Sequence, residues 1–150
     1  MPTSNTRGSK IAEFVLTATV LSAAAVSLAA PAAADGKLMT GDYEVLNKQG
    51  TVLDTWTVVP ECTRLTVGCY ASISSAVLGE LVAAHTTDNE WSSQVVGLLP
   101  ICADNSNGQG KLIFEWDGDT GTGLVTKIEQ SGCRPSQPGT VKVPIVFRPK

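Results

Sequence analysis

The chain has 150 residues, with eleven Lys and Arg, fourteen Asp and Glu, a single histidine and a net charge of −3 at pH 7. This length supplies one domain with a sizeable core. The acidic balance, with basic residues scattered singly, argues against nucleic acid or an anionic membrane as a partner, because both attract clustered positive charge.

The first residues have the pattern of an export signal. Arg7 and Lys10 precede the apolar run FVLTATVLSAAAVSLAA, and Ala32 and Ala34 fit a signal-peptidase site. We predict a signal peptide over residues 1–34 and a single secreted β domain over residues 35–150, secreted or associated with the cell envelope and without stable membrane insertion after cleavage. The alternative is a retained membrane anchor, since residues 14–30 approach the lower length limit of a span.

Beyond residue 41, almost every apolar run is short, alternates with polar residues and is bounded by Gly, Asn, Asp or Pro, which is typical of strands joined by turns. The expected strands are, in chain order, residues 43–47, 51–59, 70–74, 79–87, 91–99, 111–117, 124–130 and 140–149. Residues 75–79 are the one stretch compatible with a helical turn. Pro144 cannot donate to a ladder, so the last strand is expected to be an edge or to carry a bulge.

The fold class that follows is all-β, an antiparallel meander of about seven or eight strands, because the connections are too short for crossover helices. Such a meander closes as a small barrel or folds as a two-layer sandwich, and periodicity does not choose between them. The expected core alternates along these strands: Tyr43, Val45, Trp56, Val58, Leu81, Trp91, Val95, Leu112, Phe114, Trp116, Leu124, Ile128, Val143, Ile145 and Phe147.

All four cysteines, Cys62, Cys69, Cys102 and Cys133, lie in the exported part. An even number in an oxidising compartment predicts two disulfides, with three connectivities open. The alternating segment 65–73 is typical of a strand running through Cys69, whereas a bridge from Cys62 to Cys69 requires the chain to turn back. The other interpretation of the cysteines, a zinc site, lacks a C-x-x-C pair and a nearby histidine, so we expect no metal.

The order of several short motifs resembles that of a family. GDYEVLN, DTWTVVPEC, EWSS, ICADNSNG, FEWDGDTGTG, SGC and VFRP follow one another as in small secreted disulfide-containing β proteins of mycobacteria and their relatives, over residues 41–147. Members of this group are mostly uncharacterised, so the resemblance implies export, two disulfides and a β fold, and no reaction. The chain departs from the group in having six residues between its first two cysteines instead of a very short Gly and Pro turn.

Beside this resemblance, we predict the bridges Cys62–Cys69 and Cys102–Cys133. The first closes a short loop and implies a turn. The alternating pattern places Leu65 and Val67 in the core, and a turn in this segment makes these two the least secure of its core positions. The second closes about thirty residues, for which the chain-entropy model gives roughly 3.5 kcal/mol, so its loss is expected to destabilise the fold more.

Candidates for chemistry are few. Histidine is a common general acid or base, but His85 stands without an evident nucleophile or carboxylate partner, so a surface or half-buried position without a catalytic role is expected. Asp117 and Asp119 fit turn chemistry better than a glycosidase pair. The segment 104–108 offers oxygen ligands for calcium but lacks the downstream bidentate Glu. We therefore expect no enzyme, no catalytic residues and no cofactor.

Three tryptophans, Trp56, Trp91 and Trp116, are candidates to line a ligand cavity, although three such residues on alternating strands are equally typical of a core. The function predicted first is an exported, non-catalytic β domain that acts as a binding or cell-envelope-associated module of unknown partner. The alternatives are a carrier of a small apolar ligand in a barrel pocket and a secreted protease inhibitor that presents residues 63–67 to an extracellular protein.

Overall fold

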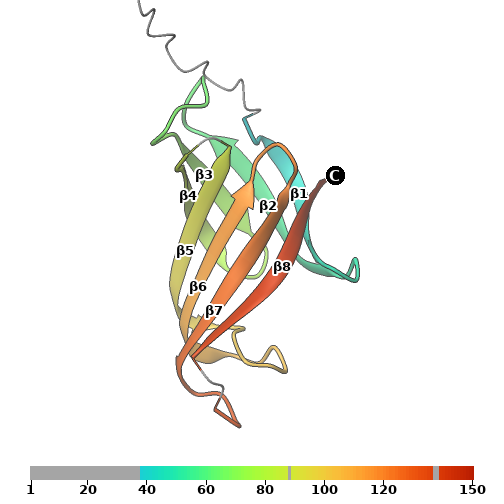
Figure 1. The fold of residues 1–150 in the computed structure, drawn as a ribbon, viewed down its shortest axis with the longest axis vertical. Helices are drawn as coiled ribbons and strands as arrows, with labels where there is room; N and C mark the ends of the chain where they lie inside the picture. The colour runs from blue at the N-terminus through green and yellow to red at the C-terminus, as the bar shows by residue number, and fades with distance from the viewer. Residues whose placement is uncertain (1–37, 88, 137–138) are drawn as a thin grey trace, which may run out of the picture. The chain divides into compact units, whose positions relative to one another are not determined.

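The computed structural model describes residues 38–87, 89–136 and 139–150, so the predicted signal peptide lies outside the described residues. Eight strands follow one another along the chain: β1 (Gly41–Asn47), β2 (Val52–Pro60), β3 (Tyr70–Ser75), β4 (Gly79–His85), β5 (Glu90–Leu99), β6 (Gly108–Asp117), β7 (Thr122–Ser131) and β8 (Thr140–Pro149). Each pairs with the next in antiparallel fashion, and β8 pairs with β1, which closes a barrel (Figure 1). The predicted meander is confirmed, and its closed form is the barrel.

The described part of the chain contains no helix, and residues 76–78 form the turn between β3 and β4. None of its segments is therefore a helix long and apolar enough to cross a membrane. We call the end of the barrel that carries the β5–β6 loop (residues 100–107) the lower end, as it lies in Figure 1, and the opposite end the upper end. The β2–β3 loop (residues 61–69) lies at the upper end.

Alternation along the strands builds most of the predicted core, because successive side chains of a strand point to opposite faces. Twelve expected members are buried or packed against the buried cluster on strands β1, β2, β4, β5, β6 and β8: Tyr43, Val45, Trp56, Val58, Leu81, Trp91, Val95, Leu112, Phe114, Trp116, Ile145 and Phe147. Val143, on β8, is a thirteenth and packs against the same cluster. The face assigned to these strands was therefore correct.

Strand β7 is the exception. Directly paired residues share a face, and Val125 pairs with Phe114 while Lys127 pairs with Leu112, so Val125 and Lys127 face the interior. Leu124 is consequently 37% exposed, and Ile128 lies outside the buried cluster, so the core positions predicted for these two residues are wrong. The residues of β7 do alternate between two faces, but the opposite set faces the interior. The sequence pattern favoured the wrong face because a glycine and a lysine occupy inward positions on this strand.

The glycine in β7 makes room for a tryptophan. Gly123 pairs with Trp116 of β6, and a Cβ atom on Gly123 would lie 2.6 Å from the Cβ of Trp116 and 2.4 Å from the carbonyl oxygen of Glu115. Any larger residue would overlap the neighbouring strand. The interior is thus filled from β6 at the upper end of this strand pair.

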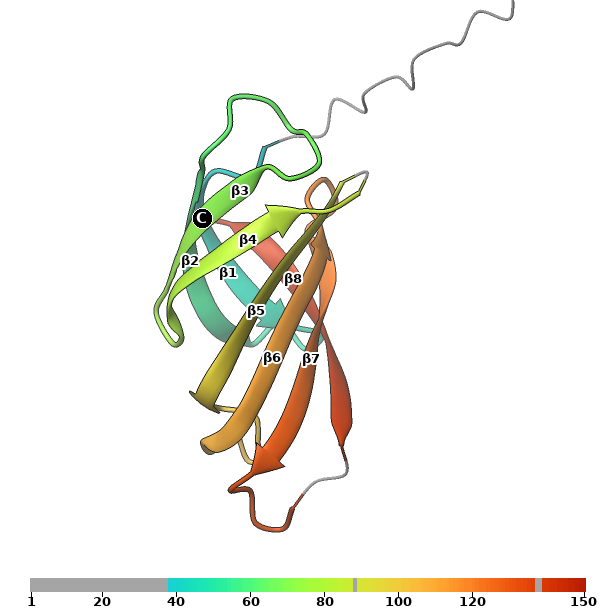
Figure 2. The same cartoon turned by 90° about the vertical axis from the view of Figure 1, so that its left-hand side faces the viewer.

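The barrel wall is uneven. Strands β4 and β5 form only three direct pairs, Ala83–Ser93, Ala84–Ser92 and His85–Trp91, and then diverge toward the lower end (Figure 2). The ladder between β1 and β8 ends at Asn47–Ile145, one residue before Pro144. Pro144 is therefore paired only on the β7 side, and β8 is an edge locally rather than over its whole length.

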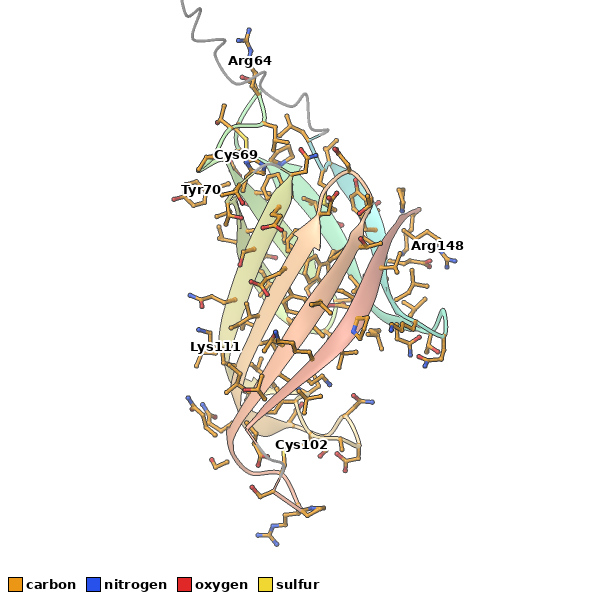
Figure 3. All side chains as sticks on the ribbon, in the orientation of Figure 1. Arg64, Cys69, Tyr70, Cys102, Lys111 and Arg148 are labelled. Atoms are coloured by element: carbon orange, nitrogen blue, oxygen red, sulfur yellow. A yellow bond between two sulfur atoms is a disulfide. The ribbon has the colours of Figure 1, made fainter. Side chains whose placement is uncertain are left out.

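Both predicted disulfides are present, one toward each end of the barrel (Figure 3). The Cα atoms of Cys62 and Cys69 are 5.8 Å apart and those of Cys102 and Cys133 are 5.4 Å apart. Strand β3 begins at Tyr70, directly after the first bridge, so a turn and not a continuous strand occupies the segment between the first two cysteines. Val67 is accordingly 71% exposed, while Leu65 packs partly against the core.

Candidate ligand-binding site

Aromatic side chains fill the upper half of the barrel. Trp56 contacts Phe114, Trp116 and Phe147, with ring centroids 5.0, 5.7 and 5.1 Å apart. Trp91 stacks on Trp116 at 6.4 Å. Edge-to-face and offset contacts of this kind add to the stabilisation from burial. This half of the barrel is therefore a packed core.

The lower half contains a cavity of about 410 Å³, which we call the lower cavity. Strands β6, β7 and β8 contribute buried apolar side chains, and the β1–β2 hairpin, the β3–β4 turn and the β5–β6 loop form its rim. Its lining is Val45, Thr51, Val52, Leu53, Asp54, Val77, Leu78, Pro100, Asn105, Leu112, Phe114, Val125, Lys127 and Ile145. A volume in this range and a mainly apolar lining with a few polar groups are typical of sites for small molecules.

None of the three predicted tryptophans lines the lower cavity. Phe114 connects the two regions, because it lines the cavity and also packs edge-on against Trp56. Trp91 and Trp116 instead contribute to a second hollow of about 550 Å³ near the β4–β5 connection and the β6–β7 turn, whose lining includes the acidic residues Glu90, Glu115 and Asp117. The tryptophans belong to the upper half of the barrel, and the lower cavity lies on the other side of Phe114.

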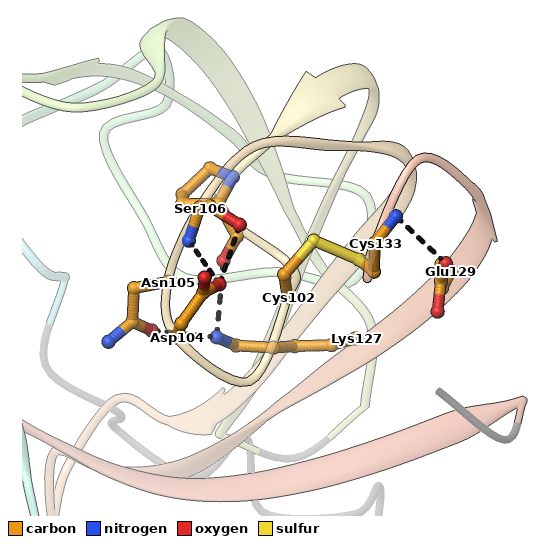
Figure 4. The surroundings of a disulfide bond; sticks show 8 residues. Cys102, Asp104, Asn105, Ser106, Lys127, Glu129 and Cys133 are labelled. Atoms are coloured by element: carbon orange, nitrogen blue, oxygen red, sulfur yellow. Dashed lines mark hydrogen bonds between the residues drawn. A yellow bond between two sulfur atoms is a disulfide. The ribbon is translucent and has the colours of Figure 1, made fainter. Parts of the chain in front are cut away.

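Among the described residues, Lys127 is the one cationic side chain that lines the lower cavity. Its ammonium donates to the carbonyl oxygen of Pro100 at 3.1 Å and to Oδ1 of Asn105 at 3.4 Å, both in the β5–β6 loop (Figure 4). Burial lowers the pKa of Lys127, because removal from water disfavours the charged form. The strand alternation that places Val125 in the core places Lys127 in the interior as well.

Asp54 is the acidic member of the same lining, and its carboxylate is fully engaged. Oδ2 accepts from Nε1 of Trp56 at 2.7 Å and from the hydroxyl of Ser75. Oδ1 accepts from the backbone N–H groups of Thr55 at 2.7 Å and Val77 at 3.1 Å. Four donors offset the cost of burying this carboxylate, so Asp54 joins β2 to the β3–β4 turn.

The second disulfide anchors the rim of the lower cavity. Cys102 in the β5–β6 loop is joined to Cys133, which follows β7, and the backbone N–H of Cys133 donates to Oε1 of Glu129 at 3.1 Å (Figure 4). Within the loop, Asp104 accepts from the hydroxyl and the backbone N–H of Ser106, and these hydrogen bonds lower the pKa of Asp104. The loop that carries Pro100 and Asn105 is therefore held at both its base and its tip.

His85 has a structural position. Its side chain is 4% exposed, Nδ1 contacts the carbonyl oxygen of Thr66 at 2.9 Å, and the ring lies edge-on to Trp91. Backbone bonds from Gly68 N to His85 O and from His85 N to Cys69 O reinforce this contact. The histidine thus ties the β2–β3 loop to β4, and its burial differs from the surface or half-buried position expected for it.

The other polar candidates lie in turns. Asp117 accepts from the backbone N–H groups of Asp119 and Thr120, which lowers the pKa of Asp117 and closes the β6–β7 turn. Among residues 38–87, 89–136 and 139–150, no group of three His, Cys, Asp or Glu side chains is arranged to hold a metal ion. The lower cavity lies elsewhere, and sequence reasoning missed its two charged residues, Asp54 and Lys127.

Of the two missed residues, Asp54 left a signal in the sequence and Lys127 did not. Asp54 falls two positions before Trp56 in a strand whose alternate residues are buried, which predicts a carboxylate facing the interior. Lys127 became recognisable only once β7 was paired with β6, since the apolar residues Leu124 and Ile128 had favoured the opposite face.

Comparison of the chain with protein-family models, with curated proteins and with solved structures finds no significant match in any of the three.

Proposed function

We propose that the protein is an exported, non-catalytic binding domain that takes up a small, largely apolar molecule in the lower cavity. The observation that carries this proposal is the division of the barrel interior, in which aromatic residues fill the upper half and a cavity of about 410 Å³ occupies the lower half. An eight-stranded barrel is just wide enough either to be filled by side chains or to hold one small ligand. The carrier, placed second from the sequence, thereby becomes the preferred function.

The chemistry of the lining supports an apolar ligand. Leu112, Phe114, Val125 and Ile145 form its buried inner wall, and Val52, Leu53 and Val77 supply the exposed hydrocarbon surface that ligand binding would remove from water. Each CH₂ group that a ligand buries there would contribute about 0.8 kcal/mol. The two disulfides are consistent with an oxidising, extracellular location. Export through the predicted signal peptide is part of the proposal.

A cavity-filling substitution tests this function. Val125→Phe places extra volume in the lower cavity, whereas Leu124→Phe, one residue away on the outer face of β7, does not. Titration calorimetry with decanol should show binding to the unmodified protein and to Leu124→Phe, and loss of binding to Val125→Phe. Thermal melts would show that both variants are folded.

Two results would count against the proposal. The unmodified protein could fail to bind decanol, or Val125→Phe could bind it as well as Leu124→Phe does, which would place the binding site elsewhere. Native mass spectrometry of protein purified from its own producer gives an independent measurement, since a small molecule retained by the unmodified protein should be missing from Val125→Phe.

A further inference from the structure

We infer that the ligand of the lower cavity is an amphiphilic carboxylate, such as a fatty acid of medium length, whose headgroup binds the ammonium of Lys127. This inference rests on the proposed function and adds the chemical class of the ligand. It stands on the position of one cationic group at the rim end of an otherwise mainly apolar cavity.

The charge of Lys127 is not neutralised by the described part of the protein. Its two hydrogen-bond acceptors, the carbonyl oxygen of Pro100 and Oδ1 of Asn105, are uncharged. In the described residues the ion pair that forms is Arg148–Glu44, on the outside of the barrel. Lys127 is half-buried, so its ammonium is partly removed from water while both of its hydrogen-bond acceptors are uncharged.

The carboxylates near this end of the barrel are engaged by other donors. Asp54 accepts four hydrogen bonds from β2, β3 and the β3–β4 turn, and Asp104 accepts from Ser106. Glu129, two residues along β7, accepts from the backbone N–H of Cys133. A ligand carboxylate would therefore provide the ammonium with an acceptor of opposite charge that these three side chains do not supply.

The geometry also orients the ligand. Lys127 hydrogen-bonds to the β5–β6 loop, while Leu112, Phe114 and Val125 line the cavity between this loop and the aromatic core. A carboxylate at Lys127 would leave its hydrocarbon chain directed toward Phe114. Lys presents three donors on a flexible stem, so it can bind the incoming carboxylate and keep at least one of its loop contacts.

A matched ligand series tests the inference by titration calorimetry at neutral pH. Decanoate, decanol and decylamine share one hydrocarbon chain and differ in headgroup charge. Decanoate should bind to the unmodified protein about tenfold to a hundredfold more tightly than decanol, as expected for a charge-assisted hydrogen bond in a partly buried site. Decylamine should bind most weakly.

Variants test whether the preference for decanoate depends on Lys127. Lys127→Met should lose the advantage of decanoate over decanol, and Lys127→Arg should retain most of that advantage. Lys142→Met removes an exposed lysine from the neighbouring strand β8 and should change neither affinity. If Lys127→Met is poorly folded, nuclear magnetic resonance of the Lys127 ammonium in the unmodified protein replaces it, and decanoate but not decanol should raise the pKa of Lys127.

The outcomes separate the two proposals. Equal affinities for decanoate and decanol, or a decanoate preference that survives in Lys127→Met, would overturn the carboxylate inference and leave the apolar cavity intact. Tighter binding of decylamine would likewise overturn it and make Asp54 the dominant charge. Binding of none of the three would remove the proposed function together with the inference.

Discussion

Asp54 holds the β3–β4 turn against β2 through both oxygens of its carboxylate. Its partners are two side chains, Trp56 and Ser75, and two backbone N–H groups, those of Thr55 and Val77. The hydroxyl of Ser75 in turn accepts from the backbone N–H of Leu78 at 2.8 Å. This network lets a barrel interior contain a carboxyl group, since each buried polar atom in it has a partner.

Removal of the Asp54 carboxylate should therefore be costly. Asp54→Ala leaves Nε1 of Trp56 and two backbone N–H groups without their acceptor, and we expect the free energy of unfolding to fall by about 3 kcal/mol or more. Asp42→Ala removes an exposed carboxylate from β1 and should change it by about 0.5 kcal/mol or less. Urea denaturation of both variants measures the difference. Equal effects would show that the network contributes no more than a surface hydrogen bond.

The burial of Lys127 leads to a second prediction, on how the free energy of unfolding depends on pH. Its pKa is lower in the folded protein than in the unfolded chain, because burial disfavours the ammonium. The unfolded state therefore binds more protons between the two pKa values, and stability rises with pH over that interval. The loss of stability caused by burying the ammonium is fully present below the pKa that Lys127 has in the folded protein. It disappears as the pH passes the pKa of the unfolded chain, about 10.4.

Lys127→Met lacks this titration and provides the comparison. The difference in the free energy of unfolding between the unmodified protein and Lys127→Met should move in favour of the unmodified protein as the pH is raised from neutral toward 10. Urea denaturation at a series of pH values gives this difference. A difference that does not change over the series, or one that moves in favour of the variant, would contradict the assigned direction of the shift.

At the scale of the elements, short strands with alternating burial were predictable because period-two patterning and turn residues are local properties of the sequence. The eight expected strands match β1 to β8, and β8 has the predicted bounds. The direction in which β7 faces was not predictable, since it depends on pairing with β6. Nor could the lower cavity be predicted from single residues, because its lining comes from five strands and three connections that only the closed barrel brings together.

Glycines inside strands show the same dependence on pairing. Gly110 in β6 lies at a register shift, and a Cβ atom there would approach the carbonyl oxygen of Ile128 to 2.2 Å and Cδ1 of Ile101 to 2.5 Å. Ile101 belongs to the β5–β6 loop and is 2% exposed. The absence of a side chain at Gly110 therefore allows the loop at the cavity rim to pack onto the sheet.

Gly110→Ala should displace either β7 or the β5–β6 loop. Since the nearest atom is backbone, we expect a loss of about 2 kcal/mol or more in the free energy of unfolding, at the upper end of typical overpacking costs. Gln109→Ala changes an exposed neighbour on the same strand and should remain within about 0.5 kcal/mol. Urea denaturation again measures both, and a neutral Gly110→Ala would mean that the sheet absorbs the extra atom without strain.

At the scale of the whole molecule, the two ends of the barrel are stabilised by different means. At the upper end, Trp56, Trp91 and Trp116 pack together and His85 ties the β2–β3 loop to β4. At the lower end the interior is hollow and β4 diverges from β5, so fewer contacts hold the structure together. The Cys102–Cys133 bridge lies at this less densely packed end, where a covalent link has most to contribute.

Removal of the two disulfides in turn should therefore have unequal effects on stability and different effects on binding. In the chain-entropy model the longer Cys102–Cys133 loop is worth roughly 3.5 kcal/mol and the Cys62–Cys69 loop about 2.5 kcal/mol.

Cys102→Ser combined with Cys133→Ser should lower stability more and also weaken decanol binding, because it frees the loop that carries Pro100 and Asn105. Cys62→Ser combined with Cys69→Ser should leave decanol binding nearly unchanged, since that bridge lies at the filled end. Thermal melts and titration calorimetry on the two double variants measure both effects, and equal losses of decanol binding would contradict a binding site confined to the lower cavity.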